Sequence, residues 1–142
     1  NFPNNFVYSV SNSQAGYIFL NVNGIPVVNS SSCNDDNNNG YCDLEVSNCE
    51  NYQCDWVAAF NPNNGVCVGA TMWDLDNCNN NTCSINVGIS SIATPDHLSI
   101  GIAPIFKVYD VSENIYYDAT PSESIPALPL QIFLIDNLTV IP

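Results

Sequence analysis

The residues best suited to binding chemistry lie in one short polar segment. Counting from Asp35, oxygen-bearing side chains fall at the first, third, fifth and ninth positions, and Gly40 occupies the sixth. Calcium binds six to eight hard oxygen ligands, and a tight glycine turn lets alternate side chains and one main-chain carbonyl surround the ion. The sequence therefore predicts calcium as a cofactor, with the ligands Asp35, Asn37, Asn39, the Tyr41 carbonyl and Asp43.

This spacing resembles that of a calcium loop of the EF-hand type. The resemblance covers nine residues and fails at the twelfth position, where Val46 replaces the bidentate glutamate. Glu45, Glu50 or a water molecule would have to supply that ligand, and we expect no helix beside the loop. The competing interpretation is a solvated surface loop rich in Asn and Asp, in which the same oxygens bind no ion.

A second acidic pair, Asp74 and Asp76, lies two residues apart, so both side chains would point the same way on a strand. Asn77 and Asn79 add further oxygens. A general acid/base pair is the catalytic alternative, but glycosidase carboxylates are usually far apart in the sequence. We interpret this segment as a solvated loop, with calcium binding as the second choice.

No combination of residues predicts catalysis. His97 is the only histidine and follows Thr94-Pro95-Asp96, a setting typical of a turn, and the chain has no Gly-x-Ser-x-Gly motif. Lys107 lies within an apolar strand, where we expect a salt bridge or extension to solvent. Because no acid, base and nucleophile converge, we expect that the protein is not an enzyme.

The seven cysteines all lie between Cys33 and Cys83, and none has the Cys-x-x-Cys spacing of a zinc site. An odd number predicts three disulfides and one further cysteine. Spacing suggests Cys49–Cys54 and Cys78–Cys83 as local pairs and leaves the remaining connectivity open. Cys67 lies in an apolar strand and is the candidate odd cysteine, either free or bonded to another chain. The disulfide candidates are Cys33, Cys42, Cys49, Cys54, Cys78 and Cys83.

The charge balance excludes several partners. Lys107 is the only Lys or Arg beside fourteen carboxylates, and the net charge is −13. Nucleic acid and anionic membrane surfaces both need clusters of basic residues. No stretch approaches the roughly 18 apolar residues of a membrane span. Disulfides form in oxidising compartments, so we expect an extracellular or cell-surface protein whose signal peptide has been removed. Possible N-glycosylation sites are Asn29, Asn80 and Asn137.

The periodicity predicts an all-β protein. About eight to ten short strands separated by turn residues predict a β-sandwich of the immunoglobulin-like or jelly-roll type, in one domain covering residues 1–142. Asn23-Gly24 predicts a hairpin turn, and residues 56–73 predict a second hairpin. Residues 29–55 and 74–83 are expected to be acidic loops held by disulfides.

Two tryptophans, Trp56 and Trp73, lie close to the acidic loops in the sequence. Aromatic rings beside Asn and Asp are typical of sugar-binding surfaces, because a ring face can stack on a sugar. We favour the other interpretation, in which both side chains anchor the core of the second hairpin.

Two functions from different classes fit these features. The first is a secreted structural subunit of a filament, tube, sheath or coat that forms a homopolymer through β-strand exchange. Its N-terminal residues 2–10 are β-prone and are the expected donor strand, unless they pair within their own domain. The second is a secreted calcium-dependent carbohydrate-binding or adhesion module, in which the residue 35–43 loop and Trp56 or Trp73 contact a glycan.

Overall fold

The computed structural model describes residues 2–27, 34–36, 38–47, 49–50, 53–78 and 82–141. Within these ranges the regular secondary structure is almost entirely β-strand, so the predicted all-β class is confirmed. No helix in them is long and apolar enough to cross a lipid bilayer. The elements are η1 (Asn4–Phe6), β1 (Ser13–Asn23), β2 (Trp56–Phe60), β3 (Cys67–Met72), η4 (Leu75–Asn77), β4 (Ser84–Ile89), β5 (Ile105–Asp110), β6 (Ile115–Pro121) and β7 (Ile132–Ile141).

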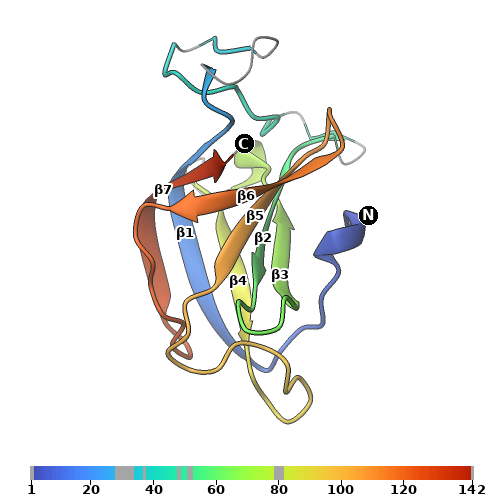
Figure 1. The fold of residues 1–142 in the computed structure, drawn as a ribbon, viewed down its shortest axis with the longest axis vertical. Coiled ribbons are helices and arrows are strands. Elements are labelled where there is room, and N and C mark those ends of the chain that lie inside the picture. Colours follow the sequence, from blue (N-terminus) through green and yellow to red (C-terminus); the bar gives the residue numbers. More distant parts are fainter. Residues whose placement is uncertain are drawn as a thin grey trace.

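The strands form one sheet in the order β3-β2-β5-β6-β7-β1-β4, which curls until it is nearly closed into a barrel (Figure 1). Neighbouring strands are antiparallel except β1 and β7, which are parallel. The end strands β3 and β4 form no ladder with each other. They still approach closely, because a Cβ added to Gly69 would lie 2.2 Å from the Asn86 carbonyl oxygen.

The barrel interior is filled by the alternate apolar side chains of its strands. Tyr17 and Phe19 of β1 pack against Phe106 of β5, with ring centroids 5.7 and 5.0 Å apart. Trp73 is buried beside Phe19, which supports its interpretation as a core residue. Burial of these rings is the main favourable contribution to the stability of the barrel.

A second apolar cluster lies on the outer face of the sheet. All five residues of β2 are buried, because Val57 and Ala59 face the interior while Trp56, Ala58 and Phe60 face outward beneath the N-terminal segment. Phe6 of that segment is fully buried in this outer cluster. The continuous apolar run of β2 therefore reflects burial on both faces of the strand.

Two predicted strand features differ in the structure. Residues 7–12 belong to no strand, because the segment lies against the outer face of the sheet rather than along an edge. The Asn23-Gly24 turn does not produce a hairpin. Instead β1 pairs with β4 and β7, and Pro26 forms an isolated bridge with Tyr41.

Candidate metal-binding site

The candidate site lies at the end of the barrel that carries the acidic loops (Figure 1). Asp55 immediately precedes β2, and Asp110 is the last residue of β5. These two strands are antiparallel with Trp56 opposite Tyr109, so the two carboxylates meet at one end of the sheet. Glu45 comes from the connection between β1 and β2. One oxygen atom from each of the three carboxylates lies within 4.8 Å of the others, so this cluster could hold a metal ion.

Asp55 organises the surrounding backbone. Its Oδ1 accepts a hydrogen bond from the Val111 N–H (2.9 Å), and its Oδ2 accepts one from the Glu45 N–H (3.1 Å). Its own N–H donates to the Glu45 carbonyl at 2.7 Å, and its carbonyl accepts the Trp73 N–H at 2.8 Å. Although it is acidic, Asp55 is only 1% exposed. The side chain therefore fixes the loop, the start of β2 and the β5–β6 turn relative to one another.

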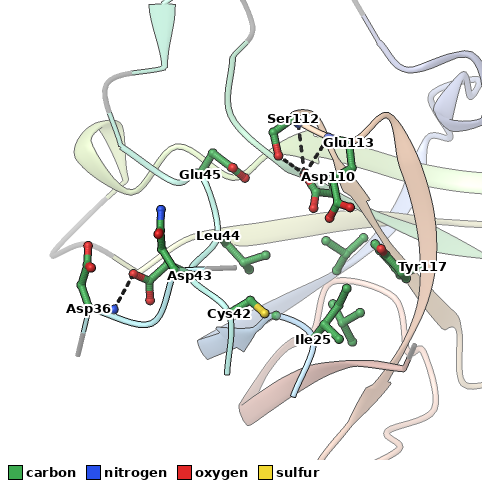
Figure 2. A pocket seen from close by; sticks show the side chains of 14 residues that line it. Ile25, Asp36, Cys42, Asp43, Leu44, Glu45, Asp110, Ser112, Glu113 and Tyr117 are labelled. Carbon is green, nitrogen blue, oxygen red and sulfur yellow. Dashed lines mark hydrogen bonds between the residues drawn. The ribbon is translucent and has the colours of Figure 1, made fainter. Parts of the chain in front are cut away.

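Asp110 shapes the turn between β5 and β6. Its Oδ1 accepts hydrogen bonds from the Ser112 N–H (3.0 Å), the Ser112 hydroxyl (2.8 Å) and the Glu113 N–H (3.3 Å). Asn114 then adopts a left-handed conformation with φ of 57°, which Asn tolerates better than most residues. This turn presents Asp110 and Glu113 toward the same cleft as Glu45 (Figure 2).

The cleft has a volume of about 520 Å³ and combines an acidic rim with an apolar floor. Glu45, Asp110 and Glu113 face one another across one part of it, while Asp43 and Asp36 lie together in another part (Figure 2). The Asp36 N–H donates to Asp43 Oδ2 at 3.0 Å. Apolar side chains of the floor include Ile25, Leu44, Val108, Tyr117 and Val140.

The electrostatics of the cluster favour bound positive charge. Burial raises the pKa of Asp55 to about 8, and the Glu45 side-chain hydrogen bond and the charges of Glu45 and Asp110 act in the same direction. The pKa of Glu113 is raised chiefly by its side-chain hydrogen bond with Asp110. Neighbouring carboxylates resist simultaneous ionisation, and they must either retain a proton or share a cation. Hard oxygen ligands in this number suit calcium or magnesium better than softer metals.

The predicted calcium loop lies beside this cleft, and the side chains of Asp35, Asn39 and Asp43 accept hydrogen bonds from backbone N–H groups of the loop itself. The Asp35 carboxylate accepts hydrogen bonds from the N–H groups of Asn39 and Gly40, each at 3.1 Å. Asn39 Oδ1 accepts the Tyr41 N–H at 3.0 Å. Asn37 lies outside the described residues. Calcium binding by this loop stays a prediction.

Asp55 and Asp110 were not among the residues singled out from the sequence, and Glu45 was named only as a substitute ligand. The sequence signal for Asp55 and Asp110 was their position at the ends of apolar runs. Asp55 directly precedes an apolar run, and Asp110 ends another. Recognising their proximity requires knowing that β2 pairs with β5, and the sequence alone does not show that pairing.

The structure places Asp74 and Asp76, the second acidic pair, in different surroundings. Asp74 Oδ2 accepts a hydrogen bond from the Asn77 side chain at 2.6 Å, whereas Asp74 Oδ1 is buried without a partner among the described residues. Asp76 lies in η4 and is exposed. Asn79 falls outside the described ranges.

Disulfide bonds link cysteines in both of the predicted acidic loops, residues 29–55 and 74–83. The structure joins Cys49 to Cys54 and Cys78 to Cys83, with Cα atoms 5.0 and 5.2 Å apart. Cys42 is also disulfide-bonded. Cys33 lies outside the described residues. Cys67 is a free, buried cysteine in β3, and burial raises its pKa to about 11. Its thiol is therefore protonated and unreactive at neutral pH.

The isolated basic residues have structural partners. Lys107 forms a salt bridge with Asp118 at 3.1 Å and lies 5.6 Å from the ring centroid of Phe60. His97 is buried, with Nδ1 3.0 Å from Asp96 Oδ1 and Nε2 2.7 Å from the Ser9 carbonyl oxygen. Both side chains thus hold neighbouring segments together.

Of the three glycosylation candidates, the structure describes only Asn137, which lies partly buried in β7. Asn29 and Asn80 lie outside the described ranges. Glycosylation stays a prediction at all three positions.

No protein-family model, curated protein or solved structure matches this chain.

Proposed function

We propose that the protein is an extracellular structural subunit that assembles with copies of itself through β-strand pairing. One observation carries this proposal. The ladder between β6 and β7 covers only Leu138–Ile141 of β7, so the first half of β7 has a ladder partner on one side only. The disulfides Cys49–Cys54 and Cys78–Cys83 fit an oxidising compartment and therefore an extracellular location.

The backbone of this half strand is oriented for pairing. The Gly16 N–H bonds to the Gln131 carbonyl at 2.9 Å, so the next N–H, that of Ile132, points away from β1. Strand alternation gives Leu134 the same orientation. An unpaired strand edge is a template for another strand, and natural proteins usually protect such edges with charge or proline.

The side chains along this edge are apolar and exposed. Ile132 is 73% exposed and Leu134 is 57% exposed. On the neighbouring strand, Ile18 lies opposite Leu134, and Leu20 follows on the same outward face. A chain with one Lys or Arg cannot form many ion pairs with a copy of itself. Apolar contact and main-chain hydrogen bonds are the interactions available to such a pair.

The test compares two variants that add the same charge. Leu134→Asp places a carboxylate on the proposed interface, whereas Ile92→Asp places one on a fully exposed residue in a loop after β4. Sedimentation velocity over a concentration series should show assembly of the wild type and of Ile92→Asp, and monomeric Leu134→Asp. A monomeric wild type at all concentrations, with disulfides intact, contradicts the proposal.

A second candidate function is calcium-dependent binding, as in an adhesion or carbohydrate-binding module. The cluster of Glu45, Asp55 and Asp110 favours it. Extracellular calcium modules bind with dissociation constants of about 10⁻⁴–10⁻³ M. Titration calorimetry should detect binding in that range, and Asp110→Asn should weaken it at least about tenfold. Asp35→Ala tests the adjacent loop separately, and the exposed Asp136→Asn is the control. Absence of heat with calcium in the wild type rejects this candidate.

A further inference from the structure

The N-terminal segment, residues 2–12, lies outside the sheet, and Phe6 is its one fully buried apolar side chain. Phe6 is fully buried on the outer face of the barrel. Its ring centroid lies 5.1 Å from that of Tyr116, 5.8 Å from that of Phe60 and 6.4 Å from that of Tyr109. We call residues 2–12 the arm. The Phe6 socket consists of Trp56, Ala58, Phe60, Cys67, Ala70, Tyr109 and Tyr116.

The arm has few other attachments. The Asn5 N–H donates to the Tyr116 hydroxyl at 3.2 Å, the Ser9 carbonyl oxygen contacts His97, and the Ser11 hydroxyl donates to the Ile89 carbonyl at 2.5 Å. No residue of the arm belongs to a strand ladder. Val7 is 67% exposed and Val10 is 70% exposed. Besides the Phe6 ring, the arm is therefore held by the Phe2 ring on Trp56 (centroids 4.9 Å apart), by half-buried Tyr8 and by a few hydrogen bonds, including one from the Gln14 side chain to the Ser11 carbonyl.

The arm is also incompletely packed against the sheet. A cleft of about 240 Å³ lies between Phe2, Pro3 and Asn4 of the arm and the side chains around Trp56. Another, of about 200 Å³, lies beneath Tyr8 and Val10. Both clefts are open at the surface, so the arm leaves parts of the outer face of the sheet uncovered.

Release of the arm leaves most of the barrel core covered. The Phe6 socket belongs to the outer apolar cluster, whereas the interior cluster around Tyr17, Phe19 and Phe106 is separate. An arm that leaves its own socket therefore exposes the socket and widens the cleft beneath Tyr8 and Val10, which Val68 of the interior cluster lines, while the rings of the interior stay covered by the strands.

Neither the arm nor the Phe6 socket is charged, so the arm of one copy meets no charge repulsion in the socket of another. Residues 2–12 contain no charged side chain, and none of the socket residues carries a charge. The arm of a second molecule can therefore approach without bringing a carboxylate into a chain of net charge −13. The structure itself shows that the socket accepts Phe6, and an identical segment from a second copy makes identical contacts. Exchange of identical elements is a low-cost route to association.

We propose that the arm is an exchange element, with Phe6 of one copy occupying the Phe6 socket of a second copy. This inference rests on the proposed function, for which it names a partner and a contact. In the isolated molecule the arm is tethered to its own socket at an effective concentration in the millimolar range. Exchange between copies therefore dominates where the subunit is crowded, as in a polymer.

The experiment removes the competing intramolecular contact. Phe6→Ala removes the ring that the arm inserts and leaves the Phe6 socket intact. Tyr116→Ala weakens the Phe6 socket and leaves the arm with its Phe6 ring, so this variant can only donate its arm. Both full-length variants and their controls also carry Leu134→Asp, which removes the proposed β7 edge contact, and each variant alone should be monomeric at micromolar concentration. Their mixture should form a one-to-one complex, with association at least about 100-fold stronger than either variant alone, because a buried Phe ring is regained.

Two controls make the experiment decisive. Mixing Phe6→Ala with the double variant Phe6→Ala/Tyr116→Ala provides no donor, so no complex should form, and Val7→Ala should donate like the wild type because Val7 is exposed. Near-ultraviolet circular dichroism checks that each variant folds, and Tyr116→Leu replaces Tyr116→Ala if the latter does not.

The outcomes separate this inference from the proposed function. If the mixture stays monomeric while the wild type assembles and Leu134→Asp does not, arm exchange is rejected and the proposed function stands. If the mixture forms the complex but the wild type never assembles, even near millimolar concentration, arm exchange stands and the proposed function fails.

Discussion

At the scale of single residues, Asp55 has the strongest structural role in the candidate site. Its buried carboxylate accepts backbone hydrogen bonds from two different segments. Asp55→Ala leaves both N–H groups without their partner, and each such loss costs about 1–3 kcal/mol. We expect a decrease of about 2–4 kcal/mol in the free energy of unfolding. Urea denaturation measures it, and Asp136→Ala, on an exposed residue of β7, should change stability by less than about 0.5 kcal/mol. Equal effects would contradict the role assigned to Asp55.

The raised pKa of Asp55 also predicts a pH dependence. The folded-state pKa of about 8 exceeds the usual value of 3.8, so the folded protein binds a proton more tightly than the unfolded chain. The stabilising contribution is complete below about pH 4 and is lost as the pH rises through about 8. Without calcium, we expect the free energy of unfolding to fall by about 1–3 kcal/mol between pH 5 and 8. Asp55→Asn should show a shallower fall. A rise in wild-type stability over this range contradicts the assignment.

At the scale of elements, the strands that carry local signals were predictable. The β2–β3 hairpin and the β5–β6 hairpin each consist of two apolar runs around a turn, and both formed. The pairing of β1 with β7 joins residues more than a hundred positions apart, and no local pattern encodes it. For the same reason the sequence indicated acidic loops but not the cluster of Glu45, Asp55 and Asp110. That cluster depends on the nonlocal pairing of β2 with β5.

The N-terminal segment shows a different limit of sequence reasoning. Its alternating apolar residues favoured a strand, and Phe6 is indeed buried. A strand and an extended arm have the same backbone period, so alternation does not show whether a segment pairs along an edge or lies across a face. The fully apolar β2 beneath the arm was the available signal, because a strand buried on both faces needs an outer cover.

The close approach of β3 to β4 predicts that Gly69 cannot be replaced without loss of stability. Gly69 of β3 allows close approach to β4, since an added Cβ would lie 2.2 Å from the Asn86 carbonyl oxygen. Gly69→Ala must displace backbone, so we expect a destabilisation of about 1–3 kcal/mol. Gly16→Ala is the matched control, because the three atoms nearest its Cβ all belong to side chains, the closest being Ile132 Cγ1 at 3.4 Å. Thermal unfolding of both variants measures the difference. Equal stability of the two variants would show that β3 and β4 can separate freely.

At the scale of the whole molecule, charge repulsion opposes folding and assembly together. A net charge of −13 with one Lys or Arg leaves most of the fourteen carboxylates without a cationic partner on the chain. Folding concentrates these charges, and association of copies concentrates them further. Three features would lower the repulsion between copies. They are the exposed apolar edge of β7, the uncharged arm, and the acidic loops, which could share a cation. We therefore expect the proposed interface between copies to be apolar and the acidic end to respond to cations.

The two effects of cations can be separated by matching ionic strength. Sodium chloride screens exposed charges over a Debye length of about 10 Å at 0.1 M, so raising it from about 10 mM to 300 mM should increase the melting temperature gradually. Calcium that occupies the cluster of Glu45, Asp55 and Asp110 should stabilise the folded state beyond this screening, because a ligand bound only to the folded state adds its binding free energy. We therefore expect a higher melting temperature in calcium chloride than in sodium chloride at equal ionic strength. Asp110→Asn should remove that excess and retain the sodium response, whereas Asp136→Asn should retain both. If calcium and sodium act equally on the wild type, the acidic end binds no specific ion and screening alone accounts for the response.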